Sequence, residues 1–595
     1  MNRDSLLRFL LIAGVGLGVW YFFLRPGSGP AQPGPPLQEK QVLEEKPDEK
    51  LCEIQGSRFK AAISTHNATV KRWLLDGTQY TVDGSPSAPP MDLVTTPSYA
   101  QHQPLRVSLG VPVEQEVPQP EILDYQIAEQ SGTSCTLSWS DGKTKLTKVI
   151  RATGKPFELE STLTVANVGA AKASHRVAME ASAFRFAKEV EGGFGRQSPF
   201  LTSVECSADG KLTDKAIGDF SPDDFKKPEF KEGGWFTVQG KVDYASVSNF
   251  YFAQALVPMS GAPSCQVQIW DRGKDFGAFY RSRLAWPVRE LAPGESDAYK
   301  VLLFSGPKER EVLAGAAGGE RRVGDLIKLG TFAIIAKVLV AFLIKAKTFL
   351  GSWGLAIIVL TITVRTVLFP LTWRQIKSGA QMRQLKPEID KLNEKFKDDA
   401  QQKQLATMEL WKKHGVNPLS GCLPVVAQMP VWFALYTSLQ TAAELYHTPF
   451  LWFRDLSAPD TIHIASWDAP FLLPVLLGAT TFIQQKLMPQ QMDPAQQKMM
   501  TYMMPAVFTA MMLFLPAGLG VYMFTNSVLG IAQTLAVEKY YAHQQASKSK
   551  PGGGGGSGIE VREKETSPTS DAKPTRGAGG KETPSLPLGK GNARV

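Results

Sequence analysis

Long apolar runs lie at the start of the chain and again from residue 354 onward, whereas residues 26–320 are polar and rich in Gly and Pro. A helix of about 20 apolar residues crosses the hydrocarbon core of a bilayer, and most of these runs approach that length. The pattern therefore predicts six transmembrane helices. The six runs are residues 9–24, 354–373, 421–443, 470–488, 499–515 and 517–537.

The long polar region carries a different pattern. Short segments such as TKLTKVIRA and CQVQIW alternate between apolar and polar residues, and Gly, Pro, Asn and Asp separate them. Alternation with a period of two is typical of strands with one buried face. We therefore predict a largely antiparallel β-sandwich domain over residues 52–319. Residues 26–51 are rich in Pro and Gly and then charged, which indicates an extended linker.

The first apolar run has two interpretations. Arg3 and Arg8 precede it, as in the positive segment of a cleaved signal peptide. However, the apolar stretch is longer than usual for a signal peptide, and no small-x-small cleavage site follows it. We therefore predict that residues 1–25 form an uncleaved transmembrane anchor.

Charge predicts the orientation of the spans. The formal net charge is +9, and the basic residues gather beside the apolar runs, which favours membrane topology over nucleic-acid binding. Residues 374–418 carry ten basic and six acidic residues, whereas residues 441–468 carry one basic and four acidic residues. The positive-inside rule places the first loop in the cytoplasm and the second outside. Residues 541–595 are then a cytoplasmic tail, which its Gly, Ser, Pro and Lys content predicts to be disordered and basic.

Residues 320–349 are helical by their spacing, but Lys337 interrupts their apolar run. A cytoplasmic N-terminus reaches a cytoplasmic 374–418 loop only across an even number of spans, and the runs at 9–24 and 354–373 already provide two. We therefore expect residues 320–349 to lie flat in the membrane interface as an amphipathic helix.

The 374–418 loop is predicted to contain two short helices, at about 377–397 and 400–413. Four apolar residues at helical spacing form one stripe, which predicts that the two helices pack on each other as a hairpin. These residues are Leu385, Ile389, Leu392 and Phe396.

Arg365 lies in the middle of the second apolar run, where a charge costs roughly 2.5–3.5 kcal/mol on insertion scales. Thr361, Gln428 and Asn526 add polar groups within the spans. Single hydroxyls and amides usually join helices to one another. Polar groups around one arginine indicate instead a water-accessible functional site. Further polar residues of the spans are Thr363, Gln440, Thr480, Thr481, Gln484, Gln485, Thr525, Ser527 and Gln533.

Conventional catalysis has little support in the sequence. The motifs GxxxxGK[ST], HExxH and GxSxG are missing, and His66, His102 and His175 lack carboxylates at ligand spacing, so we interpret them as surface or structural histidines. We predict that the chain is not an enzyme and needs no cofactor or metal.

Four of the five cysteines fall in the predicted β-domain, and Cys422 falls in an apolar run. They allow up to two disulfides in an oxidising compartment, but unpaired structural cysteines are an equal alternative, and the pairing stays open. The four are Cys52, Cys135, Cys206 and Cys265.

Several long motifs in the C-terminal half resemble the YidC/Oxa/Alb family of membrane protein insertases. They are NPLSGCLPVVAQMPVWFALY, VRTVLFPLT, SWDAPFLLPVLLGATTFIQQKL, DPAQQKMMTYMMPAVFTAMM and LPAGLGVYMFTNSVLGIAQ, which occur in family order across residues 320–540. GGWFTVQGKVDYASVSNFYFAQALVP resembles, more weakly, the periplasmic β-domain of the Gram-negative branch. The resemblance implies a five-helix insertase core at 350–540 around a hydrophilic groove, an inner-membrane location and a periplasmic β-domain.

The resemblance also implies a substrate-binding groove. Arg365 matches the family's groove arginine, and Thr361 matches a threonine that faces the substrate. Family members often carry two adjacent aromatics in the last span, whereas here Tyr522 is followed by Met523, so the substrate contact passes to Met523 or is shared by Tyr522. The predicted groove residues are Arg365, Thr361, Gln428, Tyr522, Met523 and Asn526.

We therefore expect a membrane protein insertase and chaperone that uses no nucleotide of its own. Its expected partners are nascent membrane proteins, the lipid bilayer, the Sec translocon, and ribosomes or signal-recognition components, which the basic loop and tail would contact. The alternative is a secondary transporter that binds an anionic solute at Arg365. A third interpretation is a carbohydrate-binding module or enzyme with a membrane anchor. The client range, the role of the β-domain and the oligomeric state stay open.

Overall fold

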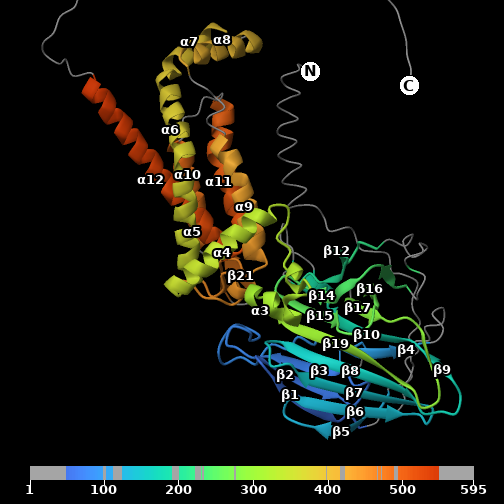
Figure 1. Cartoon of the computed structure of the whole chain (residues 1–595). Helices are drawn as coiled ribbons and strands as arrows, with labels where there is room; N and C mark the ends of the chain where they lie inside the picture. Colours follow the sequence, from blue (N-terminus) through green and yellow to red (C-terminus); the bar gives the residue numbers. More distant parts are fainter. Residues whose placement is uncertain are drawn as a thin grey trace, which may run out of the picture. The chain divides into compact units, whose positions relative to one another are not determined.

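The computed structural model describes most of the chain between residues 48 and 548 (Figure 1). The predicted anchor at 1–25 and nearly all of the tail at 541–595 lie outside the described residues, and so does Cys422. The chain divides into two units after Tyr540. The described ranges are 48–97, 102–110, 123–190, 198, 200–220, 230, 234–273, 276–396, 399–415, 423–464, 467–470, 472–487 and 494–548.

Antiparallel strands build the region from residue 51 to residue 307. The first sheet contains β1 (Leu51–Gly56), β2 (Phe59–Ser64) and β3 (Val70–Leu75), in that order. A second sheet, of five strands among the described residues, has the order β13-β16-β17-β10-β4. Its strands are β4 (Arg106–Leu109), β10 (Val177–Arg185), β13 (Phe236–Val238), β16 (Ser264–Asp271) and β17 (Ala278–Ala285).

The largest sheet has nine strands in the part of the chain that the structure describes, in the order β12-β11-β14-β15-β19-β8-β7-β6-β5 (Figure 1). Every strand pair in it is antiparallel, as the alternating sequence predicts. Its strands are β5 (Gln126–Gln130), β6 (Ser134–Ser140), β7 (Thr144–Ala152), β8 (Glu158–Asn167), β11 (Ser203–Ala208), β12 (Lys211–Ala216), β14 (Val242–Ser248), β15 (Phe252–Pro258) and β19 (Ser296–Pro307). Smaller elements are β9 (Ala173–His175) paired with β18 (Arg289–Leu291), β20 (Thr461–Ile464) paired with β21 (Trp467–Pro470), and α2 (Ala187–Val190).

Two disulfides join the sheets to one another. Cys52 on β1 pairs with Cys135 on β6, and Cys206 on β11 pairs with Cys265 on β16, with Cα–Cα distances of 6.3 and 5.9 Å. Each bond therefore connects a smaller sheet to the nine-stranded sheet. One hydrophobic core is shared by strands of all three sheets. The sequence left the pairing open because cysteine spacing alone does not show which strands face each other.

A buried ion pair ties the segment after the β-domain to β11. Glu205 has no exposed surface, and its carboxylate lies 2.8 Å from Lys328 Nζ. Burial alone would raise the pKa of Glu205, but Lys328 and Lys308 lower it to about 2. The carboxylate therefore stays charged, and it holds Lys328 close to the start of the next helix.

Helices form the region from residue 310 onward, and the predicted helix at 320–349 begins later than expected. Gly330 has a φ of +68°, a left-handed conformation that interrupts a helix, and α4 starts only at Ala333. The helical elements are α3 (Arg310–Gly315), η4 (Ala316–Gly319), η5 (Val323–Leu326), α4 (Ala333–Leu350), α5 (Trp353–Val367), α6 (Phe369–Gln384), α7 (Lys386–Lys395), α8 (Ala400–Lys413), α9 (Leu423–Gln440), η7 (Ala443–Leu445), α10 (Leu472–Leu487), α11 (Pro494–Met512) and α12 (Ala517–Lys548).

The second predicted span is not one straight helix. Its run, 354–373, is divided between α5 and α6, which are bent by 63° at Leu368. Pro370 explains the bend, because proline has no N–H to donate to the preceding turn and disfavours a helical conformation in the residue before it.

Among the described helices, α12 from Ala517 to Tyr541 is long and apolar enough to cross a membrane on its own. The bent α5–α6 pair would make a second such segment, and Met500–Met512 is a shorter apolar helix. The count of six spans therefore stays a prediction.

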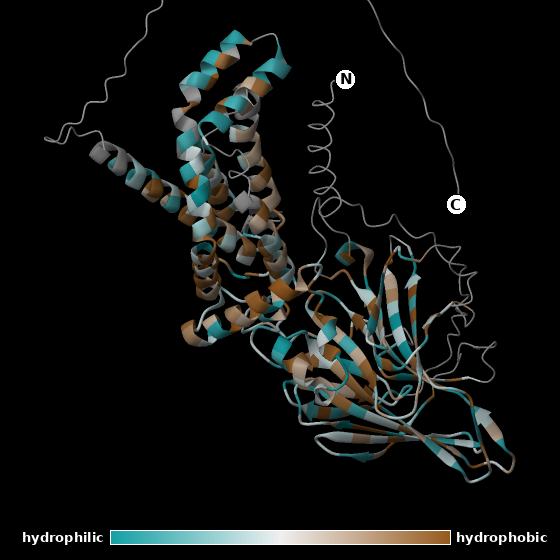
Figure 2. Cartoon of the chain, turned by 45° about the horizontal axis from the view of Figure 1, so that its top comes forward, coloured by the Kyte–Doolittle hydropathy of each residue, from teal (hydrophilic) through white to brown (hydrophobic). Residues whose placement is uncertain are grey.

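The loop at 374–418 contains two helices whose bounds differ from the predicted ones. Its first helix, α7, covers Lys386–Lys395 instead of 377–397, because α6 continues to Gln384. Leu385 and Ile389 are buried and pack against Leu410 and Trp411 of α8. Figure 2 shows hydrophilic residues along α7 and α8. The four packed residues form a small apolar cluster between α7 and α8.

Candidate functional site

Arg365 lies on the buried face of α5. The buried residues of this helix are Gly354, Ala356, Ile357, Leu360, Thr361 and Arg365, which share one face because a helix repeats every 3.6 residues. The side chain of Arg365 is only 9% exposed. The spacing that buries the apolar residues of α5 therefore also turns the arginine inward.

The guanidinium of Arg365 is held by α12. Its Nε donates to Asn526 Oδ1 at 2.6 Å, its Nη2 donates to the Asn526 carbonyl oxygen at 2.7 Å, and its Nη1 donates to Gln533 Oε1 at 3.2 Å. Asn526 and Gln533 are seven residues apart and so lie on the same face of α12. No ion pair with a carboxylate reaches Arg365 from the described residues. The charge is therefore hydrogen-bonded but not neutralised.

Gln428 of α9 adds a third helix to the site. Its Nε2 donates to Asn526 Oδ1 at 2.9 Å and lies 3.5 Å from Tyr522 OH. Tyr522 and Asn526 are four residues apart on α12, so both face Gln428. One amide oxygen, Oδ1 of Asn526, thus accepts hydrogen bonds from both α5 and α9.

A glycine permits this close approach. A Cβ atom on Gly530 would lie 2.8 Å from Arg365 Nη2 and 3.0 Å from Gln484 Nε2 of α10. These distances are shorter than ordinary van der Waals contact, so a larger residue would displace the guanidinium. Gly530 was not predicted as a site residue, because a glycine within a span carries no polar signal.

The structure brings together four of the six predicted groove residues: Arg365, Gln428, Tyr522 and Asn526. Thr361 lies one turn before Arg365 and is fully buried, but its hydroxyl donates to the Ile357 carbonyl oxygen of its own helix. Met523 is 8% exposed and belongs to the hydrophobic core of the helices. Whether any of the six contacts a client stays a prediction.

Three threonine hydroxyls of the predicted spans bond within their own helices. Thr363, Thr480 and Thr481 each donate to a carbonyl oxygen four residues earlier in their own helices. Amides and one phenol line the site instead. It contains no nucleophile beside a base, and no cluster of potential metal ligands occurs in the described part of the chain. The arrangement is suited to holding a positive charge that can attract an anion.

Comparison with known proteins places this site in a family. Residues 345–545 match the family model of the 60Kd inner membrane protein, and residues 51–342 match the YidC periplasmic domain. The membrane protein insertase YidC of Anaeromyxobacter dehalogenans is 36% identical over 512 residues, which cover 85% of this chain and 87% of that protein. The YidC of Geobacter sp. (strain M21) is 40% identical over 299 residues, covering 50% and 53%.

A crystal structure of an active YidC insertase aligns with 89% of this chain and 99% of its own, at a TM-score of 0.36 and 16% identity. That likeness is too low to support an argument, whereas the sequence matches extend over both the β-domain and the helical region. The chain therefore belongs to the YidC family of membrane protein insertases.

Proposed function

We propose that this insertase attracts the translocated segments of its clients at the Arg365 site. The observation that carries the proposal is the uncompensated charge. Arg365 donates hydrogen bonds to Asn526 and Gln533, and Gln428 donates one to Asn526. All three partners are neutral amides, so none of them carries a negative charge. Acidic residues of a client segment would supply that charge while the segment crosses the membrane.

The attraction between two opposite charges is of the same order as the cost of moving an acidic side chain into the membrane. An aspartate at the centre of a helix in the bilayer costs roughly 2.5–3.5 kcal/mol on insertion scales. Two opposite charges about 4 Å apart attract by about 4 kcal/mol at an effective dielectric constant of about 20. One arginine could therefore offset the cost of moving one acidic side chain past it. Without that attraction, the acidic segment would stay on the cytoplasmic side.

The apolar part of a client would then leave sideways along α9 and α11. Large apolar side chains on these helices are about half exposed, and methionines provide an adaptable surface for varied sequences. We propose that Thr361 and Met523 line the inner end of this path. The exposed residues are Val426 and Met429 on α9 and Tyr502, Met503 and Val507 on α11.

We further propose a topology of six spans: residues 9–24, α5 with the first part of α6, α9, α10, α11 and α12. At 1.5 Å per residue, the 18 residues of α9 and the 19 of α11 would extend about 27 and 28 Å, close to the thickness of the hydrocarbon core. Both termini would be cytoplasmic, with the domain at 52–319 in the periplasm and the core at 350–540 in the inner membrane.

In this topology α4 lies along the periplasmic interface. One side of α4 packs on the helical core through Ala336, Leu339 and Leu343. Ile334 and Val338 on the other side are 83% and 67% exposed, which is expected of residues that contact lipid. An amphipathic helix in this position would help to close the groove on its outer side.

The partners follow from this arrangement. Clients and lipid are those of the family, and we propose that the Sec translocon works beside the chain. Ribosomes or signal-recognition components would contact the basic hairpin at 374–418 and the tail at 541–595. No nucleotide, cofactor or catalytic group is needed, because burial of the apolar segment in lipid drives the last step. Nothing in the comparisons supports the alternative of a secondary transporter.

The test uses pairs of single-span clients that differ only in one or two aspartates of the translocated segment. Arg365→Ala should reduce insertion of the acidic client about tenfold or more, a factor equivalent to about 1.4 kcal/mol, and should spare the neutral one. Arg365→Lys should keep much of the activity, because it keeps the charge. Lys486→Ala, which removes an exposed charge from α10, is the matched control.

The measurement is protease protection of the translocated segment, with the level of each variant checked by immunoblotting. Equal loss of both clients with Arg365→Ala, or loss of the protein itself with Arg365→Lys, would show that the guanidinium holds α5 to α12 and does not attract clients. The protein level decides between the two roles, because lysine keeps the charge but cannot reproduce the three hydrogen bonds of the fork.

A further inference from the structure

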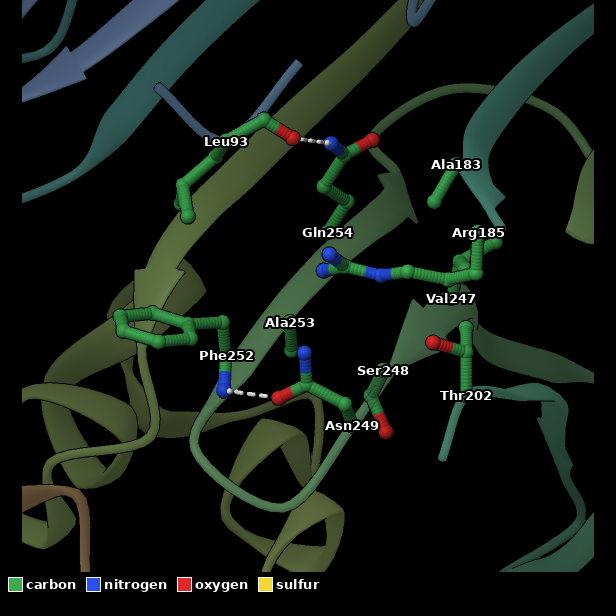
Figure 3. Close-up of a pocket in the computed structure, with 10 residues that line it drawn as sticks. All are labelled: Leu93, Ala183, Arg185, Thr202, Val247, Ser248, Asn249, Phe252, Ala253 and Gln254. Carbon is green, nitrogen blue, oxygen red and sulfur yellow. Dashed lines mark hydrogen bonds between the residues drawn. The ribbon is translucent and has the colours of Figure 1, made fainter. Parts of the chain in front are cut away.

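The β-domain contains a pocket that is separate from the Arg365 site. It is an open hollow with about 310 Å³ of empty space, open solvent included, and both the five-stranded and the nine-stranded sheets line it (Figure 3). Half of the lining residues are apolar. The polar ones are Arg185, Thr202, Ser248, Asn249 and Gln254.

Arg185 reaches across this pocket from the end of β10, and Figure 3 shows its guanidinium between Gln254 and Asn249 in that view. Its Nε is sealed from solvent and has no hydrogen-bond partner among the described residues. No hydrogen bond or ion pair to the guanidinium comes from the residues that the structure describes, and the ring of Phe200, 5.2 Å away, is its one cation–π contact there. An arginine stays charged even where burial lowers its pKa, as it does here.

No carboxylate among the described residues forms an ion pair with Arg185. Glu189 is the carboxylate that acts on Arg185 electrostatically, yet no ion pair joins the two side chains. Its Oε2 instead accepts the backbone N–H of Phe186 at 3.1 Å. Burying a charge without a partner is costly, so a counter-charge from outside the chain would stabilise this arrangement.

Asn249 provides a second donor in the pocket. Its side chain is 6% exposed, and its Oδ1 accepts the backbone N–H groups of Tyr251 and Phe252, both at 2.9 Å. These two bonds fix the amide so that Nδ2 points toward the pocket (Figure 3). Nδ2 donates to none of the described residues.

The remaining polar groups define what else a ligand would meet. The hydroxyls of Ser248 and Thr202 already donate to Glu205 Oε1 and to the Phe200 carbonyl oxygen, both at 2.8 Å. Gln254 Nε2 donates to the Leu93 carbonyl oxygen at 3.0 Å, but its buried Oε1 accepts no hydrogen bond from the residues that the structure describes. Within that part of the chain, the pocket offers a guanidinium, one amide donor and one amide acceptor to a ligand.

We propose that this pocket binds a carboxylate group, which Arg185 and Asn249 hold through their N–H donors. A guanidinium binds a carboxylate through two parallel hydrogen bonds. The apolar half of the lining suits the short hydrocarbon part of a small organic acid better than it suits an inorganic phosphate. A hydroxyl or N–H close to the carboxylate would donate to Gln254 Oε1. Two sources share this chemistry: a free hydroxy acid, and an acidic residue of a peptide with its backbone N–H.

The test is isothermal titration calorimetry on the full-length protein in nanodiscs. The ligands are lactate, its neutral analogue lactamide, inorganic phosphate, acetyl-Gly-Asp-Gly-amide and the same peptide with Asn. Saturable binding of lactate or the Asp peptide, without binding of lactamide or the Asn peptide, is the expected result. The comparison of lactate with the Asp peptide distinguishes the two sources.

Arg185→Gln should weaken this binding about ten- to a hundredfold, as loss of hydrogen bonds to a charged group does. Arg185→Lys should weaken it less, because it keeps the charge without the fork. Arg151→Gln is the matched control, since Arg151 is an exposed arginine of the same domain that already pairs with Glu160 at 2.6 Å. It should bind as the unmodified protein does.

The melting temperature without ligand is measured for each variant, and Arg185→Lys replaces Arg185→Gln in the comparison if the latter does not fold. Equal affinities of the Arg185 variants and the unmodified protein would overturn the proposal. Tighter binding of phosphate than of either carboxylate would also overturn it, and so would the absence of any saturable binding, which would indicate an arginine solvated by water.

Discussion

A single charged residue is stabilised here by neutral partners. Arg365 donates three hydrogen bonds to two residues of α12, so three of its five N–H groups are bonded, whereas no carboxylate among the described residues neutralises its charge. The sequence showed the arginine and the polar residues near it, but not which of them face it. Threonines in helices bond to their own backbone, whereas the longer amides of Gln428 and Gln533 extend to neighbouring helices. The difference in side-chain length therefore explains why the glutamines, and not the threonines, join the helices.

The closest test of this packing is Gly530→Ala. Alanine favours a helix over glycine by about 1 kcal/mol, so the change should stabilise α12 if nothing stood in its way. The new methyl group would meet Arg365 Nη2 at 2.8 Å, however, and we expect the thermal stability and the insertion of acidic clients to fall. Thermal stability is measured in the unmodified and Arg365→Ala backgrounds. The loss of stability should be smaller without the guanidinium, where only the contact with Gln484 Nε2 at 3.0 Å remains, and a loss of equal size in both backgrounds would contradict the expected clash.

At the scale of elements, the sequence predicted whether a segment is a helix or a strand better than it predicted where each element begins and ends. Alternation identified the strands, because one face of each is buried, as in β8. The late start of α4 depends on one left-handed residue, Gly330, and the bend between α5 and α6 depends on Pro370. The apolar pattern alone predicts neither the late start of α4 nor the bend between α5 and α6. The pairing of the cysteines was equally hidden, since it depends on which strands face each other across the sheets.

The α7–α8 hairpin offers a prediction for one element. Its core is small: Leu385 and Ile389 pack against Leu410 and Trp411. Ile389→Ala should cost about 2–5 kcal/mol in a packed core, which is enough to open a hairpin with so few buried contacts. Hydrogen exchange should become faster in α7 and α8 and stay unchanged in α5 and α12.

Lys391→Ala is the control for this prediction, because Lys391 is exposed on the same helix. It should leave the exchange of the hairpin unchanged. Faster exchange throughout the helical core of the Ile389→Ala variant would mean that the hairpin and the spans unfold as one unit. That outcome would contradict a separate hairpin.

At the scale of the whole molecule, two hydrophobic cores are distinct. The first joins the three sheets with the segment that ends at Ile327, and the second joins α4, α5 and α9–α12. Of the described residues in the later helical region, only Ala443 and Tyr446 belong to the first core. Every residue of the Arg365 site belongs to the helical region. Folding of the β-domain and the chemistry of insertion should therefore be separable.

Deleting residues 51–327 tests that separation. The deletion removes the first core except for Ala443 and Tyr446, and it keeps α4 and the Arg365 site. We expect both acidic and neutral clients to be inserted at more than about half the normal rate. The attraction between Arg365 and an acidic client acts over a short distance within the helical region, so it does not need the deleted domain. Arg365→Ala in the shortened chain should again reduce the insertion of acidic clients and spare that of neutral ones. Tyr446→Ser in the same chain controls for the apolar surface that the deletion uncovers. If a shortened protein that accumulates normally inserts no client, the β-domain is part of the insertion machinery and the division proposed here is wrong.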